Sequence, residues 1–243
     1  MKFLNETVLQ KIHHQEFINA KPYPWLNVSG ILTEEGYKIL VKQAPPIGLF
    51  TKNFGMQRGY GQKSHDRYTL TYKLGVSLPS VWQEFIDELL GKEYQEFITR
   101  VFGKEKFNLQ FEWHYSTRGC SVSPHCDGER KIGTHIFYLN TQEDWKEEYG
   151  GQTLVLIDTK NQSEYSSPNF SDFKEIIIPK AMGNWSFLFE KTKNSWHGVR
   201  ELTSPPEAVR KIFSVTINSI PSFQKKVITK IRTLLRRVRG GMN

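Results

Sequence analysis

The sequence lacks long apolar runs, a set of cysteines and internal repeats, and each absence excludes a class of protein. No apolar run among the 243 residues reaches the roughly 18 residues of a membrane-spanning helix. The N-terminus soon turns polar and has no apolar core of the signal-peptide kind. Two cysteines, Cys120 and Cys126, cannot form a disulfide framework. We therefore expect a globular protein of a reducing compartment, with a cytoplasmic location.

Basic charge is concentrated at one end of the chain. The formal net charge is +8, but residues 222–243 hold seven basic residues and no acidic one, which leaves +1 on residues 1–221. The main body is therefore close to neutral. This argues against a broad surface for nucleic-acid phosphates on that body.

Residues 222–243 have the pattern of a basic amphipathic helix. Apolar side chains recur there at helical spacing, and basic residues fill most of the other positions. Such a helix can pack on its own domain, lie peripherally on an anionic membrane, or bind a partner protein or nucleic acid. The sequence leaves these three roles open.

The pattern of the chain changes near residue 105. Before it, Thr33 is a candidate N-cap for a short helix, and residues 79–101 carry apolar positions spaced for one or two helices. After it, short segments rich in aromatic and β-branched residues alternate with turn residues, as in an antiparallel sandwich or barrel. We expect a mainly β domain over 1–221, in which 1–105 provides supporting helices for a core at 106–221.

His125 and Asp127 are candidate metal ligands. In an extended segment, residues i and i+2 point the same way, so the imidazole and the carboxylate would face one point. Cys126 would then point to the opposite face. The alternative is a surface turn, because Pro124 and Gly128 flank the pair.

His197 follows an apolar segment at 185–189 and is a candidate third ligand. A lone histidine beyond a strand is more often structural. With His125 and Asp127, however, it completes a set of two imidazoles and one carboxylate. That set is the facial triad of non-haem Fe(II) oxygenases, which leaves coordination positions open. Zinc would more often recruit thiolates or a third histidine.

Arg210 opens an otherwise apolar segment at 210–216. A buried guanidinium needs a partner, and a dicarboxylate would accept its paired N–H groups. The alternative is an arginine whose head lies in solvent at the end of a strand.

Several further segments complete an ordered pattern over about 105–220. Tyr115 lies ten residues before His125, and Ser214 follows Arg210 in the last strand. The other matching segments are 21–28, 134–140, 150–155 and 183–189. In this order the residues resemble the 2-oxoglutarate/Fe(II)-dependent dioxygenase superfamily, in particular its prolyl-hydroxylase-like branch.

The resemblance implies a double-stranded β-helix, the jelly-roll fold shared with cupins. It also implies that His125, Asp127 and His197 hold Fe(II) at the mouth of the barrel. The cofactors would be Fe(II), the cosubstrate 2-oxoglutarate and O2, and the resemblance allows ascorbate as an accessory reductant.

The resemblance also assigns the cosubstrate site. Arg210 and Tyr138 would bind the distal carboxylate of 2-oxoglutarate, with Ser214 assisting, and Tyr115 would lie near the keto-acid end. Ordinary aromatic packing is the alternative for both tyrosines. The gap between the last histidine and Arg210 is longer than in many members, which leaves Arg200 as a rival.

Two other histidines are interpreted as structural. His114 neighbours Tyr115 and should face away from it, and His135 alternates with Tyr138 and should point off the cosubstrate face. Segments 54–62 and 161–173 are polar and rich in Gly or Ser. We expect both segments to be mobile and to flank the substrate entrance.

The implied function is hydroxylation of an unactivated C–H bond of a small molecule or amino-acid-like substrate, with decarboxylation of 2-oxoglutarate to succinate. The runner-up is hydroxylation of a protein side chain such as proline. Nucleic-acid demethylation is disfavoured, because Thr216 stands where that subfamily has a second arginine. A non-catalytic binding module is disfavoured by the complete triad. The sequence does not identify the primary substrate.

Overall fold

The computed structural model describes residues 2–73 and 75–220. The expected basic helix at 222–243, with its three roles, lies outside the described residues. Within the described part of the chain, no helix combines the length and apolar character that crossing a membrane requires.

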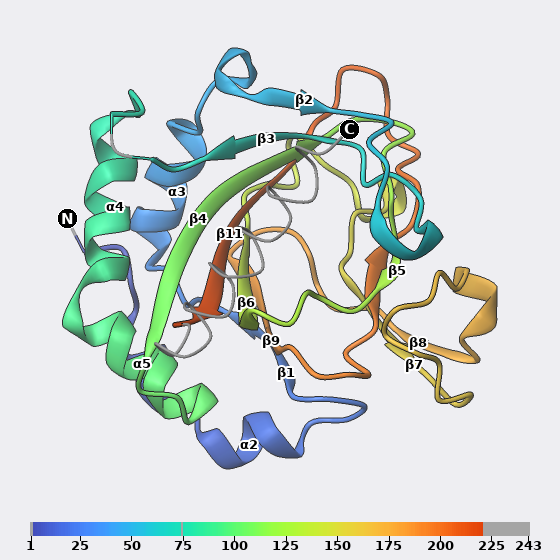
Figure 1. Ribbon diagram of the computed structural model, residues 1–243. Coiled ribbons are helices and arrows are strands. Elements are labelled where there is room, and N and C mark those ends of the chain that lie inside the picture. Colours follow the sequence, from blue (N-terminus) through green and yellow to red (C-terminus); the bar gives the residue numbers. More distant parts are fainter. Residues whose placement is uncertain (1, 74, 221–243) are drawn as a thin grey trace, which may run out of the picture.

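Eleven strands in the described residues form two antiparallel sheets that face each other (Figure 1). The larger sheet has the order β1-β9-β6-β11-β4-β3-β2, and the smaller has the order β5-β10-β7-β8. The strands are β1 Trp25–Ser29, β2 Thr51–Asn53, β3 Arg67–Thr71, β4 Phe107–Ser116, β5 Val122–His125, β6 Lys131–Tyr138, β7 Leu154–Ile157, β8 Glu175–Ile177, β9 Trp185–Glu190, β10 His197–Val199 and β11 Arg210–Ser219. Mostly β structure in this arrangement confirms the predicted double-stranded β-helix.

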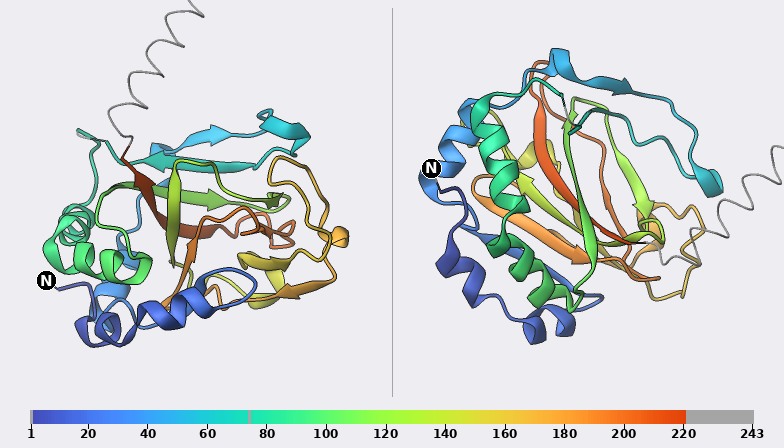
Figure 2. Two further views of the ribbon diagram at one scale, coloured as in Figure 1. Left: turned by 60° about the horizontal axis from the view of Figure 1, so that its bottom comes forward. Right: turned by 60° about the vertical axis from the view of Figure 1, so that its left-hand side comes forward.

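The helices of the N-terminal part gather on the outer face of the larger sheet (Figures 1 and 2). The α-helices are α1 Glu6–Lys11, α2 His14–Asn19, α3 Glu34–Lys42, α4 Ser80–Leu90 and α5 Lys92–Phe102, and the 3-10 turns are Ile47–Leu49, Gly59–Gly61, Glu147–Tyr149 and Phe170–Asp172. Thr33 caps α3 as predicted, because its side chain accepts a hydrogen bond from the Gly36 amide. The helical pattern at 79–101 forms two helices that meet at Gly91.

The main core lies between these helices and the larger sheet. Trp82 of α4 and Phe213 of β11 are fully buried there, with ring centroids 5.1 Å apart. Because strand residues alternate between faces, Trp113 and Tyr115 of β4 also belong to this core. Their neighbours on the opposite face point toward the smaller sheet, and the functional site is built on that face.

A second, smaller apolar cluster fills part of the space between the two sheets. It contains Tyr23, Ile136, Tyr138, Val155, Phe187, Phe189 and Ile212. The Tyr23 hydroxyl donates a hydrogen bond to the Trp196 carbonyl, next to the start of β10. This packing leaves a polar cavity beside it, between the ends of β5, β10 and β11.

Candidate metal and cosubstrate site

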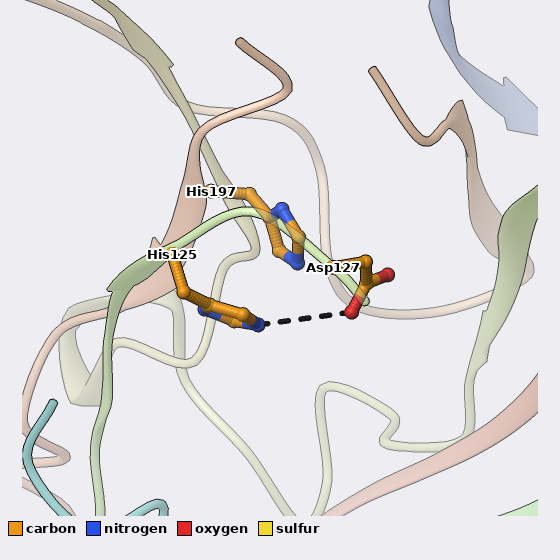
Figure 3. A group of neighbouring side chains, drawn as sticks. All are labelled: His125, Asp127 and His197. Atoms are coloured by element: carbon orange, nitrogen blue, oxygen red, sulfur yellow. Dashed lines mark ion pairs between the residues drawn. The ribbon is translucent and has the colours of Figure 1, made fainter. Parts of the chain in front are cut away.

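The two candidate histidine ligands lie on adjacent strands of the smaller sheet. His125 ends β5, His197 begins β10, and the two are direct partners in the antiparallel register. Asp127 follows β5 by two residues, and one ligand atom from each of the three side chains lies within 4.8 Å of the others (Figure 3). His125 Nε2 is 3.9 Å from Asp127 Oδ1. The structure therefore brings together the three side chains that the sequence singled out.

The protonation states of these side chains suit a divalent metal. His125 Nδ1 and His197 Nδ1 each lie 2.9 Å from a backbone carbonyl two residues earlier, which leaves both Nε2 atoms free for a metal. Burial lowers the pKa of both imidazoles, so they are neutral near pH 7.

The carboxylate of Asp127 is held in its ionised form. Burial alone would raise its pKa, but the charge of the neighbouring Lys131 holds the pKa below its ordinary value. Lys131 Nζ donates to Asp127 Oδ1 over 2.8 Å, and Thr134 Oγ1 lies 3.4 Å from Oδ2. Two neutral imidazoles and one carboxylate, with room on the open side, fit Fe(II).

A cavity of about 390 Å³ adjoins the three ligands, and Arg210 lies in its wall. Only 6% of Arg210 is exposed, and its Nε donates to the Gly151 carbonyl over 2.6 Å. Its Nη2 atom and the hydroxyl of nearby Tyr138 are buried and have no hydrogen-bond partner among the described residues. A buried cation with an unused donor fits the distal carboxylate of 2-oxoglutarate.

Gly151 makes room for this guanidinium. Its φ of +92° is in the region that favours glycine, and a Cβ atom there would lie 2.8 Å from Arg210 Cδ. Ser214, also predicted for the site, lines the same cavity from β11. The rival Arg200 is exposed outside the cavity lining, with its guanidinium 5.9 Å from the Phe170 ring. The geometry therefore favours Arg210 for the carboxylate.

Tyr115 does not lie where the resemblance suggested. Its side chain is on the helix-covered face of β4, stacked on Phe50, and its hydroxyl donates to the Pro45 carbonyl. His114 occupies the opposite face and lines the cavity, where it bonds to Glu112. The expectation that Tyr115 faces the cosubstrate and His114 faces away from it is therefore corrected. The sequence analysis had assigned the two faces of β4 the wrong way round.

His135 is structural, as the sequence indicated. It is fully buried in the helix-side core, where its Nδ1 atom lies 2.9 Å from the Tyr94 hydroxyl. Its neighbour Ile136 lies on the other face of β6 and lines the cavity. The alternation predicted for this strand is thus observed.

The sequence reasoning missed several cavity residues, among them His65 and Arg67. His65 packs against His125 with ring centroids 4.6 Å apart, and its Nε2 atom is 3.1 Å from Ser123 Oγ. Arg67, at the start of β3, lines the same cavity. The signal available in the sequence was their i, i+2 spacing before the β-branched and aromatic run at 68–72.

The family comparison agrees with this geometry. Residues 110–218 match the model of the 2OG-Fe(II) oxygenase superfamily. That span runs from β4 to β11 and contains the three ligand candidates and Arg210. Comparison with curated protein sequences found no match.

Solved structures share the fold at low sequence identity. A prolyl-4-hydroxylase from Pseudomonas putida has a TM-score of 0.59 and 10% identity, covering 89% of this chain and 99% of that one. A prolyl hydroxylase from Trichoplax adhaerens, in complex with a hypoxia inducible factor peptide fragment, has a TM-score of 0.59 and 12% identity, covering 88% and 90%. The α-ketoglutarate-dependent carbocyclase SnoK from nogalamycin biosynthesis has a TM-score of 0.58 and 12% identity, covering 92% of each chain. At these identities the likeness establishes a shared fold.

Proposed function

We propose that this chain, whose residues 110–218 match the 2OG-Fe(II) oxygenase model, is an Fe(II)- and 2-oxoglutarate-dependent dioxygenase that hydroxylates an unactivated C–H bond of a small molecule or amino-acid-like substrate. The size of the cavity is the observation that supports a small substrate. At about 390 Å³ it is near the lower end of the roughly 300–1,000 Å³ of ligand pockets. Because 2-oxoglutarate takes part of this space, the remainder suits a small reacting group.

Contacts between two entrance segments support the same choice. Segments 54–62 and 161–173 meet through a hydrogen bond from Gln62 Nε2 to the Ser166 carbonyl and another from Ser167 Oγ to the Gly61 carbonyl. Residues of both segments, together with Asp127, line a hollow beside the main cavity. Access to the metal site is therefore narrowed on that side.

The residues of the chain divide the work of the reaction. When bound, iron and 2-oxoglutarate supply the oxidising chemistry, with O2 consumed and 2-oxoglutarate decarboxylated to succinate. Arg210 and Tyr138 would orient the distal carboxylate, and His125, Asp127 and His197 would hold the metal. Apolar side chains in the cavity wall help to exclude water from the reacting atoms, namely Ile136, Phe189, Val199 and Ile212.

The test is a substrate screen with the Fe(II)-loaded protein. Succinate release would be measured with small amino and hydroxy acids and, in parallel, with proline-containing peptides. We expect coupled succinate release with a small molecule and its loss in His197→Ala. The matched control is His13→Ala, because His13 is exposed and caps nothing through its side chain. Turnover of peptides alone would replace the proposal with the peptidyl-prolyl alternative.

A further inference from the structure

The cavity carries more positive charge than its cofactors neutralise. Four cationic side chains and two carboxylates line it, namely Arg58, Arg67, Lys131, Arg210, Glu112 and Asp127. His114 adds no charge near pH 7, because burial lowers its pKa to about 4. The charges of Fe(II) and 2-oxoglutarate are equal and opposite. The loaded cavity therefore keeps an excess of two positive charges.

Two of the four cations already have a role at the metal or cosubstrate. Lys131 Nζ pairs with Asp127 over 2.8 Å, and Arg210 is the candidate partner of 2-oxoglutarate. The excess charge consequently resides on the other two arginines, which enter the cavity from the N-terminal part of the chain.

Arg67 feels the charges of Glu112 and Asp127 but is bound directly to neither carboxylate. Its guanidinium makes no hydrogen bond or ion pair with any residue of 2–73 or 75–220. Glu112, the nearest candidate on the neighbouring strand, is already engaged: Oε1 accepts from Thr71 and Gln110, and Oε2 lies 3.2 Å from His114 Nε2. Arg67 is half-buried, and burying a guanidinium without a hydrogen-bonded anion is unfavourable, so its position in the cavity wall indicates a ligand.

Arg67 and Arg210 reach the cavity from the same end of the larger sheet. Tyr68 of β3 pairs with Tyr115 of β4, and Arg210 of β11 pairs with Ser116 of the same strand. The same antiparallel register carries Arg67 to the level of Ser116, which is also the level of Arg210, with β4 between the two arginines. Two separate anion sites can therefore face the metal, one on each side of β4.

Arg58 extends the positive charge to the rim. It lies in the exposed entrance segment 54–62, and its Nε atom is 3.4 Å from Gln62 Oε1. An anion that approaches the metal from this side meets Arg58 before Arg67. Such a gradient favours capture of negatively charged molecules.

We propose that Arg67, assisted by Arg58, binds an anionic group, a carboxylate or a phosphate, on the primary substrate. This inference rests on the proposed function, because it assigns a substrate class to the same cavity. Arg210 retains the cosubstrate carboxylate, since it is the more deeply buried of the two and has an unused donor atom.

The test measures a second anion near the metal when 2-oxoglutarate is saturating. The full chain is loaded with Mn(II), which is paramagnetic, and titrated with inorganic phosphate in one series and with carbon-13-labelled acetate in another. Relaxation of the phosphorus or carbon nucleus reports an anion bound close to the metal. We expect saturable enhancement in the wild-type protein and at least about a tenfold weaker apparent affinity in Arg67→Gln, as expected for loss of a charge-assisted contact. The titration that gives relaxation enhancement, with phosphate or with acetate, identifies the anion as a phosphate or a carboxylate.

Matched variants distinguish loss of the second anion site from loss of the metal and cosubstrate site. Arg118→Gln removes an exposed arginine outside the cavity lining and should leave the titration unchanged. Arg67→Lys keeps the charge and should retain part of the affinity. The affinity for 2-oxoglutarate should change by less than about threefold in Arg67→Gln, because that site is assigned to Arg210.

Three results would overturn the inference. One is the absence of saturable relaxation enhancement in wild-type protein that binds Mn(II) and 2-oxoglutarate. This result does not depend on the folding of any variant. Another is equal enhancement in Arg67→Gln. If the wild-type chain binds neither Mn(II) nor 2-oxoglutarate, the proposed function fails and the inference fails with it.

Discussion

His197 lies directly opposite His125 in the antiparallel pair of β10 and β5, with ring centroids 4.3 Å apart. Each ring is also positioned by a backbone carbonyl, that of Ser195 or Ser123. The positions of both imidazoles are therefore set by sheet pairing. A metal site built in this way is pre-organised before the metal arrives.

We predict that His197→Ala loses Fe(II). Removal of one of three protein ligands should weaken metal affinity by more than about 100-fold, the upper range for loss of an outer-shell partner. Iron content after anaerobic loading and dialysis measures this directly. His13→Ala should retain wild-type iron content. Full iron occupancy in His197→Ala would remove this histidine from the ligand set.

We predict that Arg210→Ala weakens 2-oxoglutarate binding by well over tenfold. Loss of a buried charge-assisted contact costs on the order of 2–5 kcal/mol. Tyr138→Phe should have a smaller effect of about 1 kcal/mol, the value of one neutral hydrogen bond. Titration calorimetry with the Mn(II)-loaded protein measures both. Unchanged affinity in Arg210→Ala, together with a large loss in Arg200→Ala, would transfer the role to Arg200.

We predict that segments 54–62 and 161–173 act as lids. Amide hydrogen exchange in both should slow when Mn(II), 2-oxoglutarate and substrate are added, because closure protects their backbone. Ser167→Ala removes the hydrogen bond to the Gly61 carbonyl and should reduce the slowing in both segments. Helix α4 provides the internal reference. Unchanged exchange in both segments would rule out a lid role.

We predict that His135 makes stability depend on pH. Burial lowers its pKa to about 3, from an ordinary value near 6.5. Between these values the unfolded chain binds the proton and the folded protein does not. The free energy of unfolding should therefore decrease as the pH falls below about 6.5, with a slope of up to about 1.4 kcal/mol per pH unit from this group.

Urea unfolding between about pH 5 and pH 7 tests this dependence. The slope should be shallower in His135→Gln, which can still accept the hydrogen bond from Tyr94. In His13→Ala it should equal that of the wild-type protein. Equal slopes in all three proteins would show that His135 does not contribute.

Much of the site could be predicted from local patterns. The i, i+2 spacing of His125 and Asp127 placed both side chains on one side of an extended segment, and the structure shows them together. Arg210 was selected over Arg200 from its strand context, and only Arg210 reaches the cavity. The Thr33 cap followed from short-range chemistry. Each of these inferences depends on residues close together in the chain.

The assignment of Tyr115 and His114 depended on information that the sequence does not contain. Alternation along β4 shows that neighbours face opposite sides, but it does not show which side faces the helices. Both faces of β4 are buried at this point, as Tyr115 on one face and Ser116 on the other show. A contrast between a buried and an exposed face therefore could not identify the side that faces the helices. Only the packing of α4 against the larger sheet decides it.

The sequence by itself indicated a mainly β fold, the three candidate metal ligands and the candidate arginine for the cosubstrate, because each is encoded in local spacing and strand pattern. Only the tertiary structure decided which side chains complete the cavity. Arg67 and His65 come from a segment far from the ligand motifs in sequence, and strand pairing brings them to the metal. The physical reason is that antiparallel pairing joins distant segments, and long-range packing then selects the face that each one presents.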